Sequence, residues 1–208
     1  MRRTKRTETM NFNPRIDKNE ITTMPNILFD GRIFVIDTPN EAEKAVKALS
    51  TEKILGIDTE TRPAFKKGVS HSVSLLQLST ADTCFLFRLC RIGLPESLIG
   101  LLENKNIIKV GISLHDDYQA LNKRAAFTPG NFFDLQKYVT KFGIEEMSLQ
   151  KIYAIIFNQR ISKNQQLSNW DADVLTEKQK LYAATDAWAC LNIYNRLIEV
   201  KNEQNKNI

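Results

Sequence analysis

The sequence contains few of the residues on which zinc sites and nucleophilic triads depend, with only two histidines and three cysteines among 208 residues. Zinc is therefore disfavoured, because its protein ligands are mainly histidine and suitably spaced cysteine. A serine or cysteine triad would have to use His71 or His115, and no nucleophile elbow is present. Cys84, Cys90 and Cys190 form no CxxC pair and leave one thiol unpaired in any disulfide scheme. A reducing compartment fits this cysteine usage best.

Long apolar runs are also absent. No run approaches the roughly 18 apolar residues of a membrane-spanning helix. The first residues, MRRTKRTETMNFNPR, contain no apolar signal-peptide core. We therefore expect no membrane partner and a cytoplasmic location. Hydrophobic residues make up 42% and charged residues 25% of the chain, which is ordinary for a globular protein of this length with one substantial core.

The charge is concentrated at the N-terminus. The chain carries a net charge of +5, and +3 of it lies in the first twenty residues. Such a tail can attract phosphates regardless of sequence, or it can simply solubilise the terminus, and both interpretations stay open. Residues 1–24 show no periodicity and predict a basic, disordered tail. We expect a single domain over residues 25–201 and a C-terminal tail over residues 202–208.

The remaining chain has the pattern of an α/β domain. Apolar runs at 33–36, 54–57, 72–79 and 83–89 predict four strands, and a helix capped near Thr38 or Asn40 follows the first. The short links after the second and third strands predict an antiparallel meander. From about Leu94, helices alternate with strands at 107–110 and 131–135, which indicates parallel additions. The predicted fold is a mixed β-sheet flanked by helices, with a mostly helical C-terminal third.

The segment KILGIDTETRP contains the first candidate site. Side chains alternate along a strand, so Asp58 and Glu60 share a face, and Gly56 should leave open space beside them. Two carboxylates about 7 Å apart repel each other unless a charge compensates them, and a divalent cation is the obvious compensator. The alternative is that both residues lie in a solvated turn after the strand.

Two further segments offer acidic residues. In IIKVGISLHDDYQAL, Asp116 or Asp117 lies near the start of a helix, where it can be a site residue or only a helix cap. In TEKQKLYAATDAWACLNIY, Tyr182 and Asp186 are four residues apart and lie on one helical face. Because Asp186 interrupts an alanine- and aromatic-rich helix centre, it needs a partner. Four carboxylates and a phenol suit a two-metal phosphodiester site, since Mg²⁺ and Mn²⁺ prefer carboxylate oxygens.

These motifs resemble those of the DEDD superfamily of 3′–5′ exonucleases, in its tyrosine-bearing branch with ribonuclease D and the Werner-type exonuclease domain. The matching residues are Asp58 and Glu60 for D-x-E, Asp117 with Leu121 for the second motif, and Tyr182 and Asp186 for Y-x-x-x-D. We prefer Asp117 to Asp116 because it keeps the apolar residue four positions on. The segments VSLLQLS and LSNWDADVL are also similar to the family, and the resemblance runs from about Phe34 to Leu197.

The resemblance implies a ribonuclease H-like fold and a division of roles. The four acidic residues would bind two divalent cations, Mg²⁺ or Mn²⁺; they are Asp58, Glu60, Asp117 and Asp186. Tyr182 would orient the attacking water, since a phenol with an ordinary pKa near 10 is a poor base at pH 7. The expected reaction removes nucleoside 5′-monophosphates from the 3′ end of DNA or RNA. Alternatives are an inert nucleic-acid-binding module on the same fold and a hydrolase of small phosphoesters.

Three residues are candidates for holding the nucleic acid. Lys163 resembles a basic family residue that contacts phosphate. Arg62 follows the first motif and is expected to line the path of the strand, and Phe65 is expected to stack on a base. Each of them can equally be an ordinary loop or core residue. The sequence does not distinguish DNA from RNA and indicates no protein partner.

Overall fold

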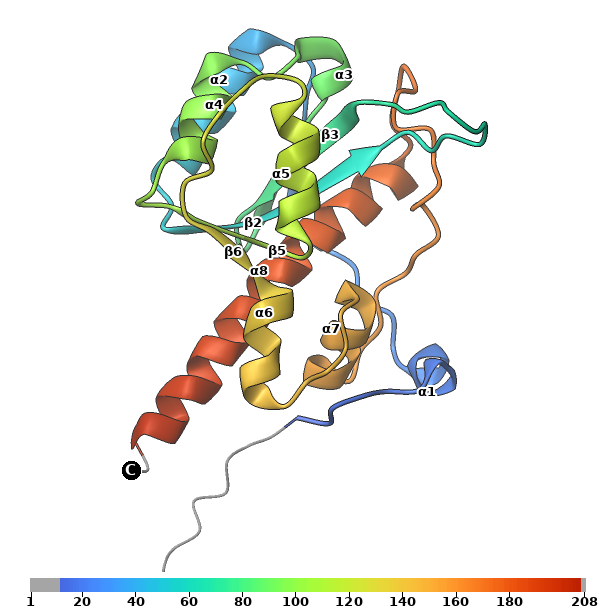
Figure 1. The fold of residues 1–208 in the computed structure, drawn as a ribbon, viewed down its shortest axis with the longest axis vertical. Coiled ribbons are helices and arrows are strands. Elements are labelled where there is room, and N and C mark those ends of the chain that lie inside the picture. The colour runs from blue at the N-terminus through green and yellow to red at the C-terminus, as the bar shows by residue number, and fades with distance from the viewer. Residues whose placement is uncertain (1–11, 207–208) are drawn as a thin grey trace, which may run out of the picture.

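The fold is a six-stranded mixed sheet between two layers of helices, seen in a computed structural model that describes residues 12–206 (Figure 1). The strands are β1 (Arg32–Ile36), β2 (Ile54–Thr61), β3 (Val73–Ser79), β4 (Thr83–Phe87), β5 (Ile108–Gly111) and β6 (Phe132–Asp134). The helices are α1 (Lys18–Thr23), α2 (Pro39–Leu49), α3 (Leu89–Ile92), α4 (Glu96–Glu103), α5 (Leu114–Asn122), α6 (Leu135–Val139), the 3₁₀ helix η1 (Thr140–Phe142), α7 (Leu149–Phe157) and α8 (Glu177–Lys206). None of these helices combines the length and apolar character that a membrane crossing requires.

The sheet has the order β1-β4-β3-β2-β5-β6. Strand β3 runs antiparallel to both β2 and β4, which confirms the predicted meander, and the other neighbouring strands are parallel. The predicted cap at Thr38 is present as a capping box with Glu41. The predicted mixed sheet flanked by helices is therefore confirmed.

The two faces of β2 pack against different helices. Leu55 and Ile57 belong to a buried cluster with α2, α4 and α5. The opposite face of the sheet meets α8, which runs along the length of the molecule (Figure 1). The carboxyl-terminal part of α8 packs instead with α6 and α7 in a second cluster. One long helix thus supports both the sheet and the smaller helices.

Helix α8 approaches the sheet closely at Gly56. A Cβ atom built on this glycine would lie 1.9 Å from the carbonyl oxygen of Ala187. The predicted open space beside the carboxylates is therefore wrong, because the backbone of α8 fills it. Because Gly56 has no side chain, α8 can pack closely against β2, and Asp186, the neighbour of Ala187, lies against this strand.

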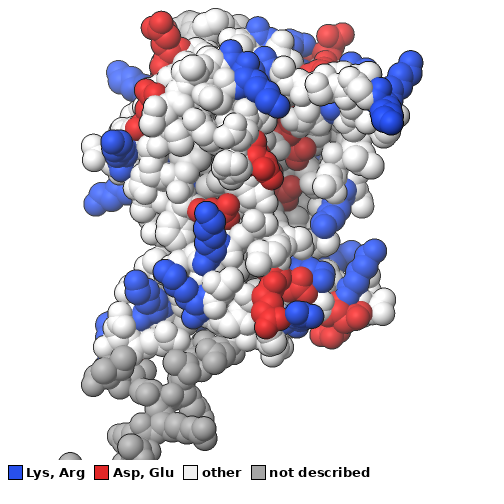
Figure 2. Space-filling model, viewed as in Figure 1, with Lys and Arg blue, Asp and Glu red and all other residues white. Residues whose placement is uncertain are grey.

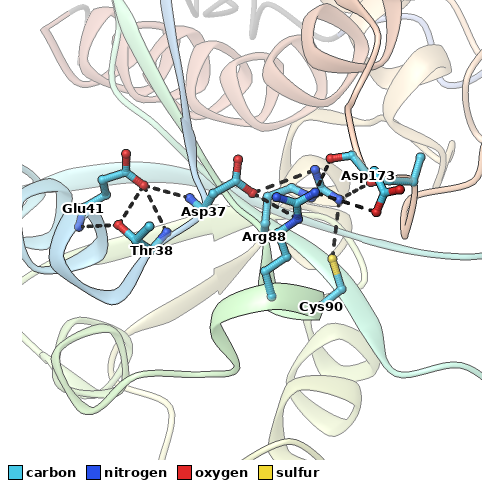
Figure 3. A network of polar contacts seen from close by, with 8 residues as sticks. Asp37, Thr38, Glu41, Arg88, Cys90 and Asp173 are labelled. Atoms are coloured by element: carbon cyan, nitrogen blue, oxygen red, sulfur yellow. Dashed lines mark hydrogen bonds and ion pairs between the residues drawn. The ribbon is translucent and has the colours of Figure 1, made fainter.

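A buried arginine anchors the segment that leads into α8 (Figure 3). Arg88 has 1% of its side chain exposed, donates a hydrogen bond to the carbonyl of Ala172 and lies 3.9 Å from the Asp37 carboxylate. Arg91 lies 3.5 Å from the same carboxylate and donates to the carbonyl of Asp173. The two arginines thereby connect residues 172–173, which precede α8 in the chain, to the loop after β1.

Part of each predicted tail belongs to the folded domain. From residue 12 the chain contacts the domain: the amide of Phe12 donates to Phe142, and Pro14 accepts from Glu145. Helix α1 then buries Ile21. These contacts are distant in sequence, so local periodicity did not indicate them. Residues 1–11 of the predicted tail lie outside the described residues. At the other end, α8 continues through Lys206 and includes most of the tail predicted from residue 202.

Candidate active site

Strand β2 presents two acidic side chains where its pairing changes. Its pairs with β5 run from Ile54 to Gly56, whereas its pairs with β3 continue to Thr61. The part of β2 that carries Asp58 and Glu60 therefore has no β5 partner on one side. Asp58 is half-buried and Glu60 is buried. The alternative of a solvated turn is wrong, because both residues lie within the strand.

Asp186 completes a compact acidic cluster from the α8 side. Asp58, Glu60 and Asp186 each offer one carboxylate oxygen, and these three atoms lie within 4.8 Å of one another. Burial, followed by the charges of Glu60 and Asp186, raises the pKa of Asp58 well above its usual value. Burial also raises the pKa of Glu60 to about 9 and that of Asp186 to about 7. Ionising this cluster without a compensating cation is therefore unfavourable.

Tyr182 lies one helical turn before Asp186 and forms part of the same site. Its phenol lowers the pKa of Asp186 and so favours the ionised form of that aspartate. Burial and the nearby carboxylates raise the pKa of Tyr182 above its ordinary value. The ring of the fully buried Trp170 has its centroid 6.0 Å from that of Tyr182. Tyr182 is therefore neutral and packed against a buried ring.

Asp117 approaches the cluster from α5. The helix begins at Leu114, and its N-cap residue is Ser113, so neither predicted cap at Asp116 or Asp117 is present. Asp117 is half-buried, and burial raises its pKa to about 6. Its charge raises the pKa of both Asp58 and Glu60, although it is not one of the three carboxylates within 4.8 Å. Asp116 is exposed.

Two residues that hold Asp117 in place were not predicted from the sequence. Thr59 donates a hydrogen bond from Oγ1 to the Asp117 carboxylate. Asp134, at the end of β6, accepts a 3.1 Å hydrogen bond from the amide of Leu114 and so takes the place of an N-cap. An aspartate at the carboxyl end of a parallel strand was a usable signal for Asp134. Nothing in the sequence indicated Thr59, since its partner is distant along the chain.

The acidic cluster lines a cavity of about 260 Å³. Lys163 lines the same cavity, and its charge favours the ionised form of Asp186. The predicted substrate residues Arg62 and Phe65 line a neighbouring groove with Leu167, and Phe65 is 83% exposed. Figure 2 shows acidic side chains in the hollowed centre of one face and basic side chains around them. His115, by contrast, is exposed and lines neither cavity.

A sequence model described as 3′–5′ exonuclease matches residues 33–200. The chain belongs to the 3′–5′ exonuclease family. The family membership confirms the predicted superfamily and the predicted nuclease class. It also accounts for an acidic cluster set beside a cavity with basic residues at its edge.

Two relatives and one solved structure illustrate this membership. The chain is 34% identical over 155 residues to the mouse bifunctional 3′–5′ exonuclease/ATP-dependent helicase WRN, covering 72% of this chain and 11% of that protein. It is 35% identical over 151 residues to fruit-fly exonuclease 3′–5′ domain-containing protein 2, covering 71% of this chain and 26% of that protein. The chain thus spans only a minor part of both relatives.

The fold is shared with the crystal structure of the Aedes aegypti Nibbler EXO domain. The TM-score is 0.74 at 21% sequence identity, and the match covers 83% of this chain and 89% of the other. The ribonuclease H-like exonuclease fold expected from the sequence is thereby confirmed.

Proposed function

We propose that this protein is a metal-dependent 3′–5′ exonuclease that hydrolyses the terminal phosphodiester bond at the 3′ end of DNA or RNA and releases nucleoside 5′-monophosphates. The observation that carries this proposal is the cluster of Asp58, Glu60 and Asp186, whose oxygens lie within 4.8 Å of one another in a largely buried site. Such a cluster opposes folding unless it binds cations, so its retention supports a catalytic role.

The donor set fits magnesium or manganese. All three clustered ligand atoms are carboxylate oxygens, the type that these hard cations prefer. Asp58, Glu60 and Asp186 would hold one cation, and Asp117 at the edge of the cluster would contribute to a second. When bound, such ions supply a nucleophile at neutral pH and stabilise the charge that develops on the phosphate.

Tyr182 supports membership in the tyrosine-bearing branch. It lines the cavity together with Asp186, and its raised pKa keeps the proton on Oη at neutral pH. We assign it the orientation of the attacking water through that oxygen. Because the phenol stays neutral, it holds the water in place and does not remove its proton.

The basic and apolar residues around the cavity would hold the nucleic acid. Lys163 faces the cavity of the acidic cluster and is suited to contact the phosphate of the terminal nucleotide. Phe65 and Leu167 in the adjoining groove expose apolar side chains on which an unpaired base can stack, and Arg62 lies beside them. The path of the 3′ end would therefore run from this groove into the acidic cavity.

The experiment is digestion of matched 5′-labelled single-stranded DNA, single-stranded RNA and recessed duplexes with Mg²⁺, Mn²⁺ or EDTA. A ladder that shortens from the 3′ end is expected with either metal and not with EDTA. Asp58→Ala and Asp117→Asn should abolish it, whereas the exposed neighbour Asp116→Asn is the matched control and should retain it. A ladder that survives Asp58→Ala, or no ladder on any polymer, would contradict the proposal. The second result would favour a binding module or a small phosphoester substrate.

A further inference from the structure

Gln77, in the middle of β3, has an unusual environment. Its side chain is completely buried, and neither its Oε1 nor its Nε2 has a hydrogen-bond partner among the described residues. Burying an amide without partners costs on the order of 1–3 kcal/mol in proteins, so such groups are rare. A glutamine at this position therefore needs a reason other than packing.

The register of the sheet places this amide beside the acidic cluster. Gln77 lies directly opposite Asp58 in the antiparallel pairing of β2 and β3. Side chains at directly opposite positions project from the same face, with Cβ atoms about 5 Å apart. Gln77 therefore points to the α8 face of the sheet, as Asp58 does.

Among the neighbours of Gln77 on this face, Ser79 donates its hydroxyl to the Thr80 carbonyl, and two leucines flank the amide. Leu86 lies opposite it on β4, and Leu75 precedes it by two residues on β3. Both leucines are fully buried in one cluster with Ala183 and Ala184 of α8. No partner for the amide comes from these side chains. The carboxylate of Asp58 is the polar group that the sheet pairing brings next to it.

Asp58 is in turn short of hydrogen-bond donors. The nearby carboxylates of Glu60 and Asp186, whose oxygens lie within 4.8 Å of one of its own, have no proton to donate when they are ionised. A carboxylate that binds a cation is held in orientation by donors to its remaining lone pairs. Such outer partners typically change metal affinity 10- to 100-fold when they are mutated.

We propose that Gln77 is a positioning residue for Asp58, donating a hydrogen bond from Nε2 to the Asp58 carboxylate, directly or through one bound water, when the site holds divalent cations. This inference rests on the proposed function, because it requires cations at Asp58. It explains why a buried amide is retained between two leucines, where an apolar residue would pack at lower cost.

Gln77→Met tests the inference, because methionine has a similar length and no amide. In EDTA the variant should unfold at the same temperature as the wild type or higher, since it removes an unpaired buried group. Its Mn²⁺ dissociation constant, measured by titration calorimetry, should rise about 10- to 100-fold. Leu86→Met is the matched control, since it changes the same cluster on the side away from Asp58 and should keep the affinity within about twofold. An unchanged affinity in Gln77→Met would overturn the inference.

Two further measurements separate this inference from the proposed function. If the wild type does not bind Mn²⁺, or if Asp58→Asn binds it equally well, the proposed metal site fails and the role of Gln77 fails with it. If the wild type binds Mn²⁺ and Asp58→Asn does not, an unchanged Mn²⁺ affinity in Gln77→Met refutes only the positioning role of Gln77. Should Gln77→Met not fold, a crystal structure of the wild type with Mn²⁺ decides. Nε2 must then lie within hydrogen-bond distance of the Asp58 carboxylate or of a water bound to it, and an unpaired Nε2 overturns the inference.

Discussion

Removing one charge from the acidic cluster should make the metal-free protein more stable. Asp186→Asn keeps the size of the side chain and one of its oxygens, but it cannot ionise. Burial raises the pKa of Asp186 from 3.8 to about 7. Since a tenfold change in proton affinity corresponds to about 1.4 kcal/mol, the ionised aspartate lowers the free energy of unfolding by about 4 kcal/mol at pH 8.

The effect has a defined pH dependence. The folded state binds the proton more tightly than the unfolded state, so stability is highest at low pH and is lost as the pH rises through about 7. In EDTA, urea unfolding followed by circular dichroism should therefore show Asp186→Asn as the more stable protein at pH 8, by up to about 4 kcal/mol. The difference should shrink steadily toward pH 4.

Manganese should narrow the difference between the two proteins at pH 8, because it stabilises only the wild type. A ligand that binds only the folded state at 100 times its dissociation constant stabilises it by about 2.7 kcal/mol. The wild type should gain this stability with Mn²⁺, and Asp186→Asn should not. The exposed Asp116→Asn serves as control and should change stability by no more than about 0.5 kcal/mol. The reasoning is refuted if Asp186→Asn is no more stable than the wild type at pH 8 in EDTA, or if their difference does not vary with pH.

Three other substitutions test separate parts of the site. Gly56→Ala should lower the free energy of unfolding by about 1–3 kcal/mol and weaken Mn²⁺ binding, because the added methyl group meets the Ala187 carbonyl and displaces α8. An unchanged free energy of unfolding would contradict that contact. Tyr182→Phe should lower kcat by about 10²- to 10⁴-fold, whereas the Mn²⁺ affinity measured by calorimetry should stay the same. A loss of Mn²⁺ affinity would show that the phenol acts on the metal site instead. Lys163→Ala should raise KM for single-stranded nucleic acid, because Lys163 lines the cavity of the acidic cluster. Lys178→Ala, in a neighbouring pocket, should leave KM unchanged. An equal rise in KM in both variants would show that the two lysines attract the nucleic acid only through their charge.

The sequence predicted the sheet better than the contacts between its parts. Apolar runs and short links identified the meander, because strand alternation is a local property. The spacing of Tyr182 and Asp186 likewise placed both on one helical face. The close approach at Gly56 was missed, since a glycine in a strand does not reveal which backbone will lie against it. The packing of residues 12–24 and the hydrogen bond from Thr59 to Asp117 were missed for the same reason: their partners are far away in sequence.

The start of α5 shows a further limit. An aspartate near the start of this helix was expected to be either a site residue or a cap, but the helix begins at Leu114 after Ser113 in the left-handed conformation. Asp134, at the end of β6, accepts from the amide of Leu114, the first residue of the helix. A cap supplied by tertiary structure carries no local signal, so the pattern around the two aspartates was insufficient to find the boundary.

The dependence of the acidic cluster on α8 has a consequence for protein synthesis. Asp58, Glu60 and Asp117 leave the ribosome well before Asp186, and the backbone of α8 also fills the space over Gly56. A nascent chain without this helix lacks both the last carboxylate and the surface that holds β2 in place. Under the proposed function, a nascent chain from which α8 has not yet emerged is therefore unable to cleave nucleic acid. Cleavage becomes available only when α8 has emerged and docked.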